Sequence, residues 1–211
     1  MNTGTLNERI DLINTLESGQ TFLWERVGDG VYETVLDGEA IRVKEDGPVV
    51  RYETTGDVSE AEDTIREALG LDCSLDAVHS SFPDDARLEK AVERYGGMRV
   101  VSDPFFPCAV SFIISAQNRI PRIKKLVSDI RREYGEAVDF GDGTLYSFPD
   151  PSTLAQVPED ELRDLGLGYR APYVVETSRM VADGEVDPDE IRSMGYHDAH
   201  NAVQGLVGVG D

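Results

Sequence analysis

Residues 31–52 read VYETVLDGEAIRVKEDGPVVRY, three apolar–polar alternations separated by Asp-Gly pairs at 37–38 and 46–47. Alternation with a period of two is typical of a strand with one buried face, and Asp-Gly between two such runs favours a tight hairpin. A further turn signal, Gly-Asp-Gly, stands at residues 28–30. We therefore expect an antiparallel sheet within residues 8–54.

Helical periodicity replaces this pattern after residue 57. Residues 104–117 are strongly apolar and favour a central buried helix, and residues 120–134 carry apolar side chains at i, i+3 and i+7. Helices are expected at residues 58–69, 84–95, 104–117, 120–134, 158–164, 169–183 and 196–205. A sheet followed by helices predicts an α+β fold, with a β-rich domain at 1–95 and a helical domain at 96–211.

The charge is strongly acidic, with 41 Asp and Glu against 20 Lys and Arg and a formal net charge of −21. Phosphate binding needs local positive charge, so the overall composition argues against a nucleic-acid partner. An acidic, lysine-poor surface also suits strong salt, where charges are screened within a few ångströms, and we expect a halophilic source, with an acidic protein of ordinary salt as the alternative. Residues 115–134 depart from this pattern, because they hold six basic and two acidic side chains. This basic segment predicts a local anionic partner.

Nothing in the sequence indicates a membrane or secreted protein. No apolar run approaches the roughly 20 residues of a membrane span, and the first twenty residues carry acids without the apolar stretch of a signal peptide. Cys73 and Cys108, the only cysteines, are expected to be buried, reduced and structural. We expect a cytoplasmic, nucleoid-associated protein.

Residues 206–210 read LVGVG and follow the helix expected at 196–205. A helix followed by a tight Gly-x-Gly turn suggests a helix–hairpin–helix module. Gly208 and Gly210 would let the backbone approach a phosphate, toward which helix N–H groups then point. Taken alone, the segment also fits an ordinary glycine-rich turn.

Two further segments combine turns with polar or aromatic side chains. Residues 166–173 read GLGYRAPY, in which Tyr169 could wedge into a base stack and Arg170 could bond to a base edge or a phosphate. Residues 115–122 read SAQNRIPR, in which Gln117 and Asn118 could donate and accept toward an exposed base. A glycine cap beside a core tyrosine, and a polar loop between helices, are the respective alternatives.

The segments at 18–24 (SGQTFLW), 103–122, 166–171 and 206–210, in this order, resemble the 8-oxoguanine DNA glycosylase branch of the helix–hairpin–helix glycosylase superfamily. The resemblance covers residues from about 8 to 211. It implies a β-sheet domain followed by an all-α glycosylase domain, and base-excision repair with AP lyase activity. The implied partner is double-stranded DNA containing oxidised guanine, whose damaged base is flipped into a pocket. A monomer with no required cofactor is implied as well.

The resemblance also implies roles for single residues. The Gly19 carbonyl would accept the N7 hydrogen that 8-oxoguanine has and guanine lacks. Gln117 stands where the family has an asparagine that fills the vacated space, and this departure puts the opposite-base preference in doubt. Arg122 and Arg170 match the arginines that contact the orphaned cytosine, and Tyr169 matches the wedging tyrosine.

The hairpin carries two further expectations from the family. Backbone carbonyls of Gln204, Leu206 and Val209 would hold a monovalent or divalent cation that bridges to phosphate. The nucleophilic lysine stands two residues after the second hairpin glycine, which is position 212 here, immediately after Asp211, and the family's aspartate lies further on. We therefore expect no catalytic residue within residues 1–211, and a polypeptide of these residues that is inactive as a glycosylase.

Three other interpretations remain open from the sequence. An alkylation-damage glycosylase of the same superfamily shares the layout, although the string at residues 18–24 argues against it. A non-catalytic protein that binds damaged DNA would keep the same surface. The third interpretation sets the resemblance aside and takes the sequence as an acidic α+β protein with a small-molecule pocket. His197 and His200 share a helix face, but no third metal ligand is evident.

Overall fold

The structure, a computed structural model, describes residues 1–210. It contains two compact units: unit 1 comprises residues 1–103 and 138–145, and unit 2 comprises residues 104–137 and 146–211. The domain boundary expected at 95/96 stays a prediction. No helix within residues 1–210 combines the length and the apolarity that a membrane span requires.

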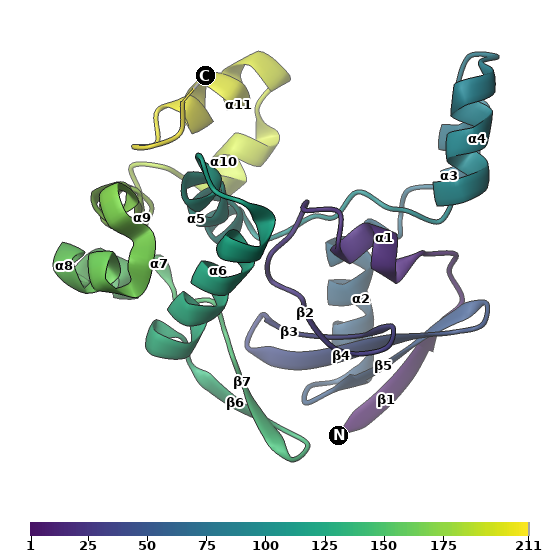
Figure 1. The fold of residues 1–211 in the computed structure, drawn as a ribbon, viewed down its shortest axis with the longest axis horizontal. Helices are drawn as coiled ribbons and strands as arrows, with labels where there is room; N and C mark the ends of the chain where they lie inside the picture. The colour runs from purple at the N-terminus through teal and green to yellow at the C-terminus, as the bar shows by residue number, and fades with distance from the viewer. Residues whose placement is uncertain (211) are drawn as a thin grey trace. The chain divides into compact units, whose positions relative to one another are not determined.

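Unit 1 is built on a five-stranded antiparallel sheet (Figure 1). Its spatial order is β1-β5-β4-β3-β2, and the strands are β1 (Asn2–Leu6), β2 (Glu25–Gly28), β3 (Val31–Leu36), β4 (Glu39–Asp46) and β5 (Val49–Thr54). The predicted hairpins are confirmed, because β3 pairs with β4 and β4 with β5 across the two Asp-Gly turns. Gly38 and Gly47 take the positive φ angles that such turns require.

Four helices complete the polypeptide of unit 1: α1 (Leu12–Leu16), α2 (Val58–Ala68), α3 (Leu75–Ser80) and α4 (Ala86–Tyr95). Asp57 caps α2 by accepting from the backbone N–H groups of Ser59 and Glu60. The Tyr52 hydroxyl donates to the Val58 carbonyl (2.9 Å) and joins β5 to this helix. The helices expected at 58–69 and 84–95 are confirmed within a residue or two.

The expected strand region at 8–54 is wrong at its beginning. Residues 12–16 form α1, whose first turn is capped by the Asp11 carboxylate accepting from the Asn14 N–H, and a strand at 2–6 precedes it. A short apolar run does not distinguish a strand from a buried helical turn. The pairing of β1 with β5 joins residues about fifty positions apart, which local patterns do not reveal.

The two cysteines also differ from the expectation. Cys73 and Cys108 are both exposed, so the expectation that they are buried is wrong. Cysteine is a small side chain that is often buried, but its position in the chain alone does not fix its burial.

A second hairpin lies in the region expected to be wholly helical. Strands β6 (Ala137–Phe140) and β7 (Gly143–Tyr146) pair with each other. Phe140 is buried against Val35 and Ala40 of the main sheet, with Val138 and Leu145 beside it. This contact contributes to the burial of Val35, so that β3 is buried at consecutive positions rather than at alternate ones.

Unit 2 is mainly helical, and residues 138–145 of the hairpin belong to unit 1. Its helices are α5 (Phe105–Ser115), α6 (Ile120–Tyr134), α7 (Pro151–Gln156), α8 (Glu159–Leu162), α9 (Ala171–Ala182), α10 (Pro188–Ser193) and α11 (Tyr196–Gln204). The prediction of a central helix at 104–117 is confirmed, since Val110, Ile113 and Ile114 of α5 are at most 1% exposed. Two short helical turns, Arg163–Leu167 and Gly168–Arg170, connect α8 to α9.

Candidate nucleic-acid interface

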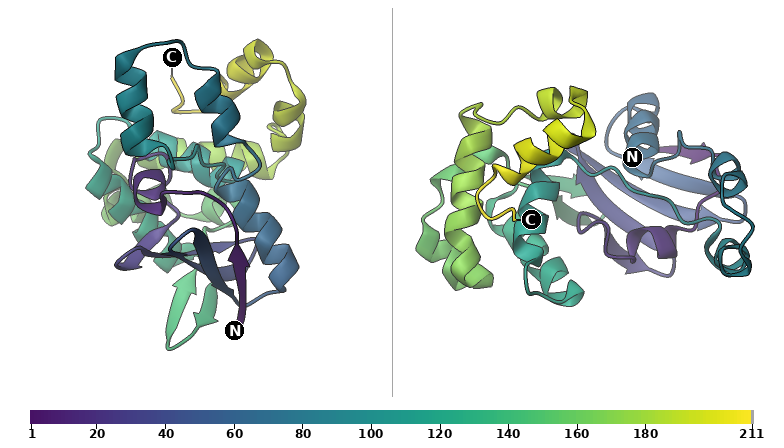
Figure 2. Two further views of the ribbon diagram at one scale, coloured as in Figure 1. Left: turned by 90° about the vertical axis from the view of Figure 1, so that its right-hand side faces the viewer. Right: turned by 90° about the horizontal axis from the view of Figure 1, so that it is seen from above.

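The loop after α11 returns to the side of helix α9 (Figure 2). Close packing and one hydrogen bond hold the loop there. Gly208 has a φ of 90°, and a Cβ atom there would lie 2.7 Å from the Cβ of Tyr173. The Thr177 hydroxyl donates to the Val207 carbonyl (2.9 Å), and Leu206 is buried. Gly208 and Gly210 are both exposed, so their backbone is accessible to a ligand as the sequence predicted.

The predicted cation ligands lie in the same loop. The Leu206 carbonyl accepts one hydrogen bond, from the Val209 N–H (3.1 Å). Its second lone pair could coordinate a cation. Gln204 is the last residue of α11, and Val209 is half-buried. Carbonyl oxygens are hard donors that fit a hard cation. The residues therefore fit the cation, and the site stays a prediction.

The expected position of the catalytic lysine follows the end of this loop. Asp211, immediately after which the sequence predicts the family's nucleophile, lies outside the described residues 1–210. The expectation that residues 1–211 hold no catalytic residue therefore stays a prediction. The prediction rests on sequence spacing alone, because the family's lysine stands two residues after the second hairpin glycine, which is Gly210 here.

Tyr169 presents its ring at the turn before α9. Gly166 and Gly168 have φ angles of 110° and 60°, which permit the sharp turn. The Tyr169 side chain is held edge-on to Tyr173, with ring centroids 6.3 Å apart, and the Arg170 guanidinium lies 4.4 Å from its ring centroid. Tyr169 is nevertheless 52% exposed. A large exposed ring supported on two sides suits insertion between bases.

Arg170 is buried, although the sequence suggested a direct contact with DNA. Its Nε donates to the Ala116 carbonyl (3.0 Å), Nη2 donates to the same oxygen, and Nη1 donates to the Leu167 carbonyl (3.4 Å). The guanidinium thereby joins the predicted segment at 115–122 to the one at 166–173. Its proposed contact with a base stays a prediction.

The loop between α5 and α6 is shaped by two polar residues. The Asn118 side-chain Nδ2 donates to the Ile114 carbonyl (2.7 Å), and its backbone N–H donates to the Ser115 carbonyl (2.9 Å), so Asn118 caps the end of α5. Gln117 is exposed and has a φ of 55°, a left-handed conformation that asparagine adopts more readily than glutamine. Gln117 therefore presents its side chain at some conformational cost.

Arg122 connects α6 to the same turn, because its Nη2 donates to the Gly166 carbonyl (2.9 Å) while the side chain stays exposed. Other members of the basic segment have structural partners: Arg131 is buried and its Nε donates to the Tyr146 carbonyl (2.8 Å), and Lys125 pairs with Asp129. Fewer side chains of the basic segment are therefore available to bind an anion than its sequence suggested.

Gly19, the predicted base-reading residue, belongs to unit 1. It is half-buried and has a φ of 87°. Among the hydrogen bonds of residues 1–210, none is donated to the Gly19 carbonyl. The role of this oxygen in reading the base stays a prediction.

Asp103 lies in the same unit and bonds to Thr21, two residues after Gly19. Burial raises the pKa of the Asp103 carboxyl to about 6, although a hydrogen bond with the Thr21 side chain opposes the shift. Within residues 1–210 its Oδ1 has no hydrogen-bond partner. The buried carboxylate is therefore costly once it ionises.

Replacing Asp103 by asparagine should stabilise the protein at neutral pH. A carboxyl whose folded pKa of about 6 exceeds its unfolded value of 3.8 stabilises the fold below pH 4, and this stabilisation is lost as the pH rises through 6. The loss amounts to at most about 3 kcal/mol. Urea unfolding of wild type and Asp103→Asn at pH 4.5 and 8, in equal salt, measures it. A wild-type-minus-variant difference that is the same at both pH values would contradict the expectation.

Three supporting residues were missed in the sequence. Tyr173 stands four positions after Tyr169, a helical spacing that hinted at their contact, whereas Thr177 and Gln20 gave no local signal. The His197 ring lies edge-on to the exposed Tyr196 ring and the His200 ring is tilted against it, with centroids 5.5 and 6.0 Å away. No group of three His, Cys, Asp or Glu within residues 1–210 is placed to bind a metal.

Sequence comparison divides the chain into two matched regions. The N-terminal domain of 8-oxoguanine DNA glycosylase matches residues 5–108, and the HhH-GPD superfamily of base excision DNA repair proteins matches residues 110–208. A probable N-glycosylase/DNA lyase of Methanothermobacter thermautotrophicus is 33% identical over 230 residues, which cover 95% of this chain and 72% of that protein.

Solved structures of similar fold include two of the Clostridium acetobutylicum 8-oxoguanine glycosylase/lyase. The apo form gives a TM-score of 0.91 at 26% identity and covers 100% of this chain and 74% of that one. The form in complex with double-stranded DNA containing cytosine opposite 8-oxoG gives 0.89 at 27% identity, over 96% and 70% of the two chains.

Proposed function

The chain belongs to the 8-oxoguanine DNA glycosylase/lyase family of helix–hairpin–helix base-excision repair proteins, and we propose that residues 1–211 bind duplex DNA and read 8-oxoguanine opposite cytosine. The observation that carries the proposal is the exposed Tyr169 ring, fixed between Tyr173 and Arg170 on the unit that also exposes Gly208. We propose that the protein binds as a monomer.

Three residues of unit 2 and Gly19 of unit 1 each have a separate role in the proposal. The Gly208 loop approaches a phosphate through its backbone, which needs no dense array of lysines on an acidic protein. Tyr169 fills the gap left by the flipped base and offsets part of the few kcal/mol that unstacking costs. Arg122 bonds to the orphaned cytosine, and the Gly19 carbonyl accepts the N7 hydrogen of the flipped base.

The polypeptide of residues 1–211 is proposed to bind without excising the base. The family's nucleophilic lysine would stand at position 212, immediately after Asp211, and no lysine within the helical region meets the sequence requirement of following the hairpin. Incubation with a duplex that carries 8-oxoguanine, followed by chromatography of the released bases, tests this point. Release of 8-oxoguanine above the rate of the DNA alone would contradict it.

Replacing Arg122 by alanine should weaken binding to duplex DNA by about tenfold and lower the salt dependence of the affinity by about one released ion. The reason is the loss of an exposed guanidinium beside the Tyr169 turn. Fluorescence anisotropy across a KCl series measures both quantities.

Arg179→Ala is the matched control, because Arg179 is an exposed arginine of α9 that pairs with Glu176. Both substitutions change the net charge equally. Equal weakening by the two variants would show that general electrostatics, rather than the Arg122 site, accounts for the binding. An unchanged affinity of Arg122→Ala would exclude Arg122 from the interface.

A further inference from the structure

The side chain of Gln20 bridges two segments of unit 1. Its Nε2 donates to the Arg99 carbonyl (2.9 Å) and to Ser18 Oγ (2.9 Å), and it lies 3.3 Å from the Thr15 carbonyl. Its Oε1 accepts from the Val101 N–H at 3.3 Å. One amide therefore connects the residues on either side of Gly19 to the segment at 99–101.

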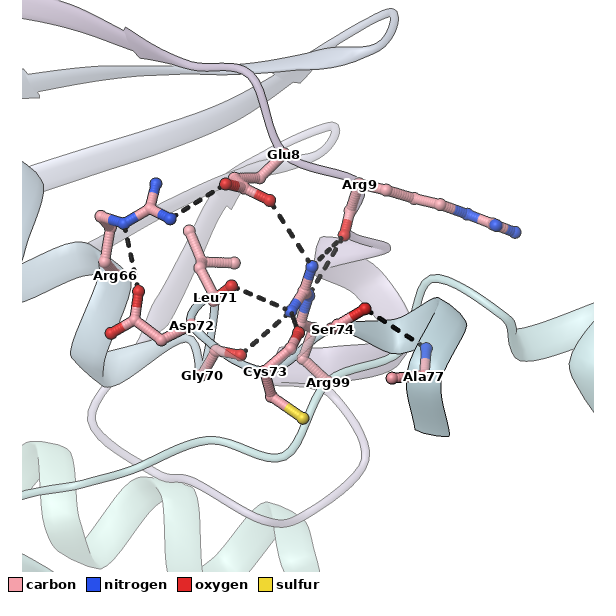
Figure 3. A network of polar contacts seen from close by, with 10 residues as sticks. All are labelled: Glu8, Arg9, Arg66, Gly70, Leu71, Asp72, Cys73, Ser74, Ala77 and Arg99. Atoms are coloured by element: carbon pink, nitrogen blue, oxygen red, sulfur yellow. Dashed lines mark hydrogen bonds and ion pairs between the residues drawn. The ribbon is translucent and has the colours of Figure 1, made fainter. Parts of the chain in front are cut away.

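That segment is itself fixed by the buried side chain of Arg99 (Figure 3). The guanidinium donates to the carbonyls of Arg9 (3.1 and 3.0 Å), Gly70 (3.0 Å) and Cys73 (2.6 Å). The backbone N–H of Arg99 donates to Thr15 Oγ1 (3.1 Å), and Thr15 is fully buried. Gln20 is thus anchored to a part of the unit that is held by several independent hydrogen bonds.

The partners of Gln20 match the two ends of an amide. Two of them, the Arg99 and Thr15 carbonyls, are acceptors, whereas the Val101 N–H is a donor. An amide offers two N–H donors and a carbonyl acceptor on one head group, whereas a hydroxyl has a single donor and a carboxylate has none. A carboxylate at this position would face two carbonyl oxygens, and an apolar side chain of equal length would leave all of these groups without their partner.

The proposed role of the neighbouring Gly19 carbonyl, to accept the N7 hydrogen of 8-oxoguanine, depends on the direction in which the carbonyl points. A hydrogen bond holds over donor–acceptor distances of about 2.7–3.2 Å and weakens steeply outside a narrow range of angles. Recognition that depends on one N–H group therefore tolerates little movement of the acceptor. Gly19 itself has no side chain to hold its peptide, and its φ of 87° lies where glycine moves freely.

We infer that Gln20 is a positioning residue for lesion recognition, which fixes the direction of the Gly19 carbonyl through its bonds to the 99–101 segment and to Ser18. The inference rests on the proposed role of Gly19. It predicts that Gln20 governs the preference for 8-oxoguanine over guanine, whereas the affinity for undamaged duplex does not depend on Gln20.

Two substitutions of Gln20 test the inference in the polypeptide of residues 1–211. Gln20→Met and Gln20→Glu should each reduce the ratio of affinities for an 8-oxoguanine:cytosine duplex and its guanine:cytosine counterpart by about tenfold, the equivalent of one hydrogen bond. Affinity for the undamaged duplex should stay within about twofold for Gln20→Met. Ser18→Ala, which removes one exposed partner of Gln20, should produce a smaller loss of the same kind.

Gln156→Glu is the matched control for charge. Gln156 is an exposed glutamine whose Nε2 donates to the Ser152 carbonyl (3.0 Å), so the substitution adds the same charge and removes a bond of the same type. It should leave the affinity ratio unchanged. Amide hydrogen exchange at Val101 gives a readout that does not depend on DNA, and it should become faster in Gln20→Met than in wild type.

The outcomes separate the inference from the proposed function. A wild type that prefers the lesion, with a Gln20→Met variant that keeps this preference, overturns the role of Gln20 and leaves the proposed function intact. A wild type that binds both duplexes equally overturns the lesion-reading role and the inference together. The inference is supported if Gln20→Met loses the preference, exchanges the Val101 amide faster and binds undamaged DNA as the wild type does. General destabilisation of the protein would instead lower its affinity for both duplexes.

Discussion

Replacement of Arg99 by methionine is expected to lower the free energy of unfolding by about 3–5 kcal/mol. The Arg99 side chain is 4% exposed, and its guanidinium satisfies the carbonyls of Arg9, Gly70 and Cys73. Methionine fills a similar volume but donates no hydrogen bond to these oxygens, of which the Gly70 carbonyl keeps only a long bond from the Cys73 N–H (3.4 Å). Each buried polar group that is left unsatisfied costs about 1–3 kcal/mol. Urea unfolding followed by the fluorescence of Trp24, the only tryptophan and a buried residue of unit 1, measures the effect.

Arg87→Met serves as the control for this measurement. Arg87 lies on α4, its side chain is 91% exposed, and it pairs with Asp85 in the adjacent cap position. Removal of an exposed arginine of this kind should not change the unfolding midpoint measurably. A loss of stability in Arg99→Met no greater than in Arg87→Met would show that the buried network does not hold unit 1 together.

Replacement of Gly208 by alanine is the second large effect that we expect, with a loss of about 2–4 kcal/mol from strain at positive φ and from steric overlap. The new Cβ would stand 2.7 Å from Tyr173 Cβ and 2.9 Å from its Cγ. Tyr173 supports the Tyr169 ring, so a shift of Tyr173 should also weaken DNA binding. Thermal unfolding by circular dichroism, with anisotropy on duplex DNA, measures both consequences.

Gly210→Ala distinguishes this steric effect from a general intolerance of the loop. A Cβ at Gly210 would meet no atom of the described residues within 4 Å, and the residue does not have a positive φ. Gly210→Ala should therefore unfold at the wild-type temperature. If Gly208→Ala also unfolds at that temperature, the close packing of the loop on α9 is not a source of stability.

Local sequence patterns identified those elements whose signals lie within a few residues. The Asp-Gly turns predicted the hairpins that join β3, β4 and β5, because Asp-Gly adopts the tight turn that two neighbouring antiparallel strands need. Apolar periodicity located α5 and α6 because burial of one helix face repeats every three to four residues. The sequence did not predict the helix at 12–16 or the hairpin of β6 and β7, because their conformation depends on distant partners.

The interface shows the same division. The sequence by itself determined the motifs in which Tyr169, Gly208 and Arg122 stand, because these motifs are contiguous strings. The tertiary structure decided which of the described residues are free to act. It placed Arg170 on the Ala116 carbonyl, left Tyr169 exposed, and joined Gln20 to the segment at 99–101. Burial and hydrogen bonding are properties of residues brought together from far along the chain, and no string of neighbours specifies them.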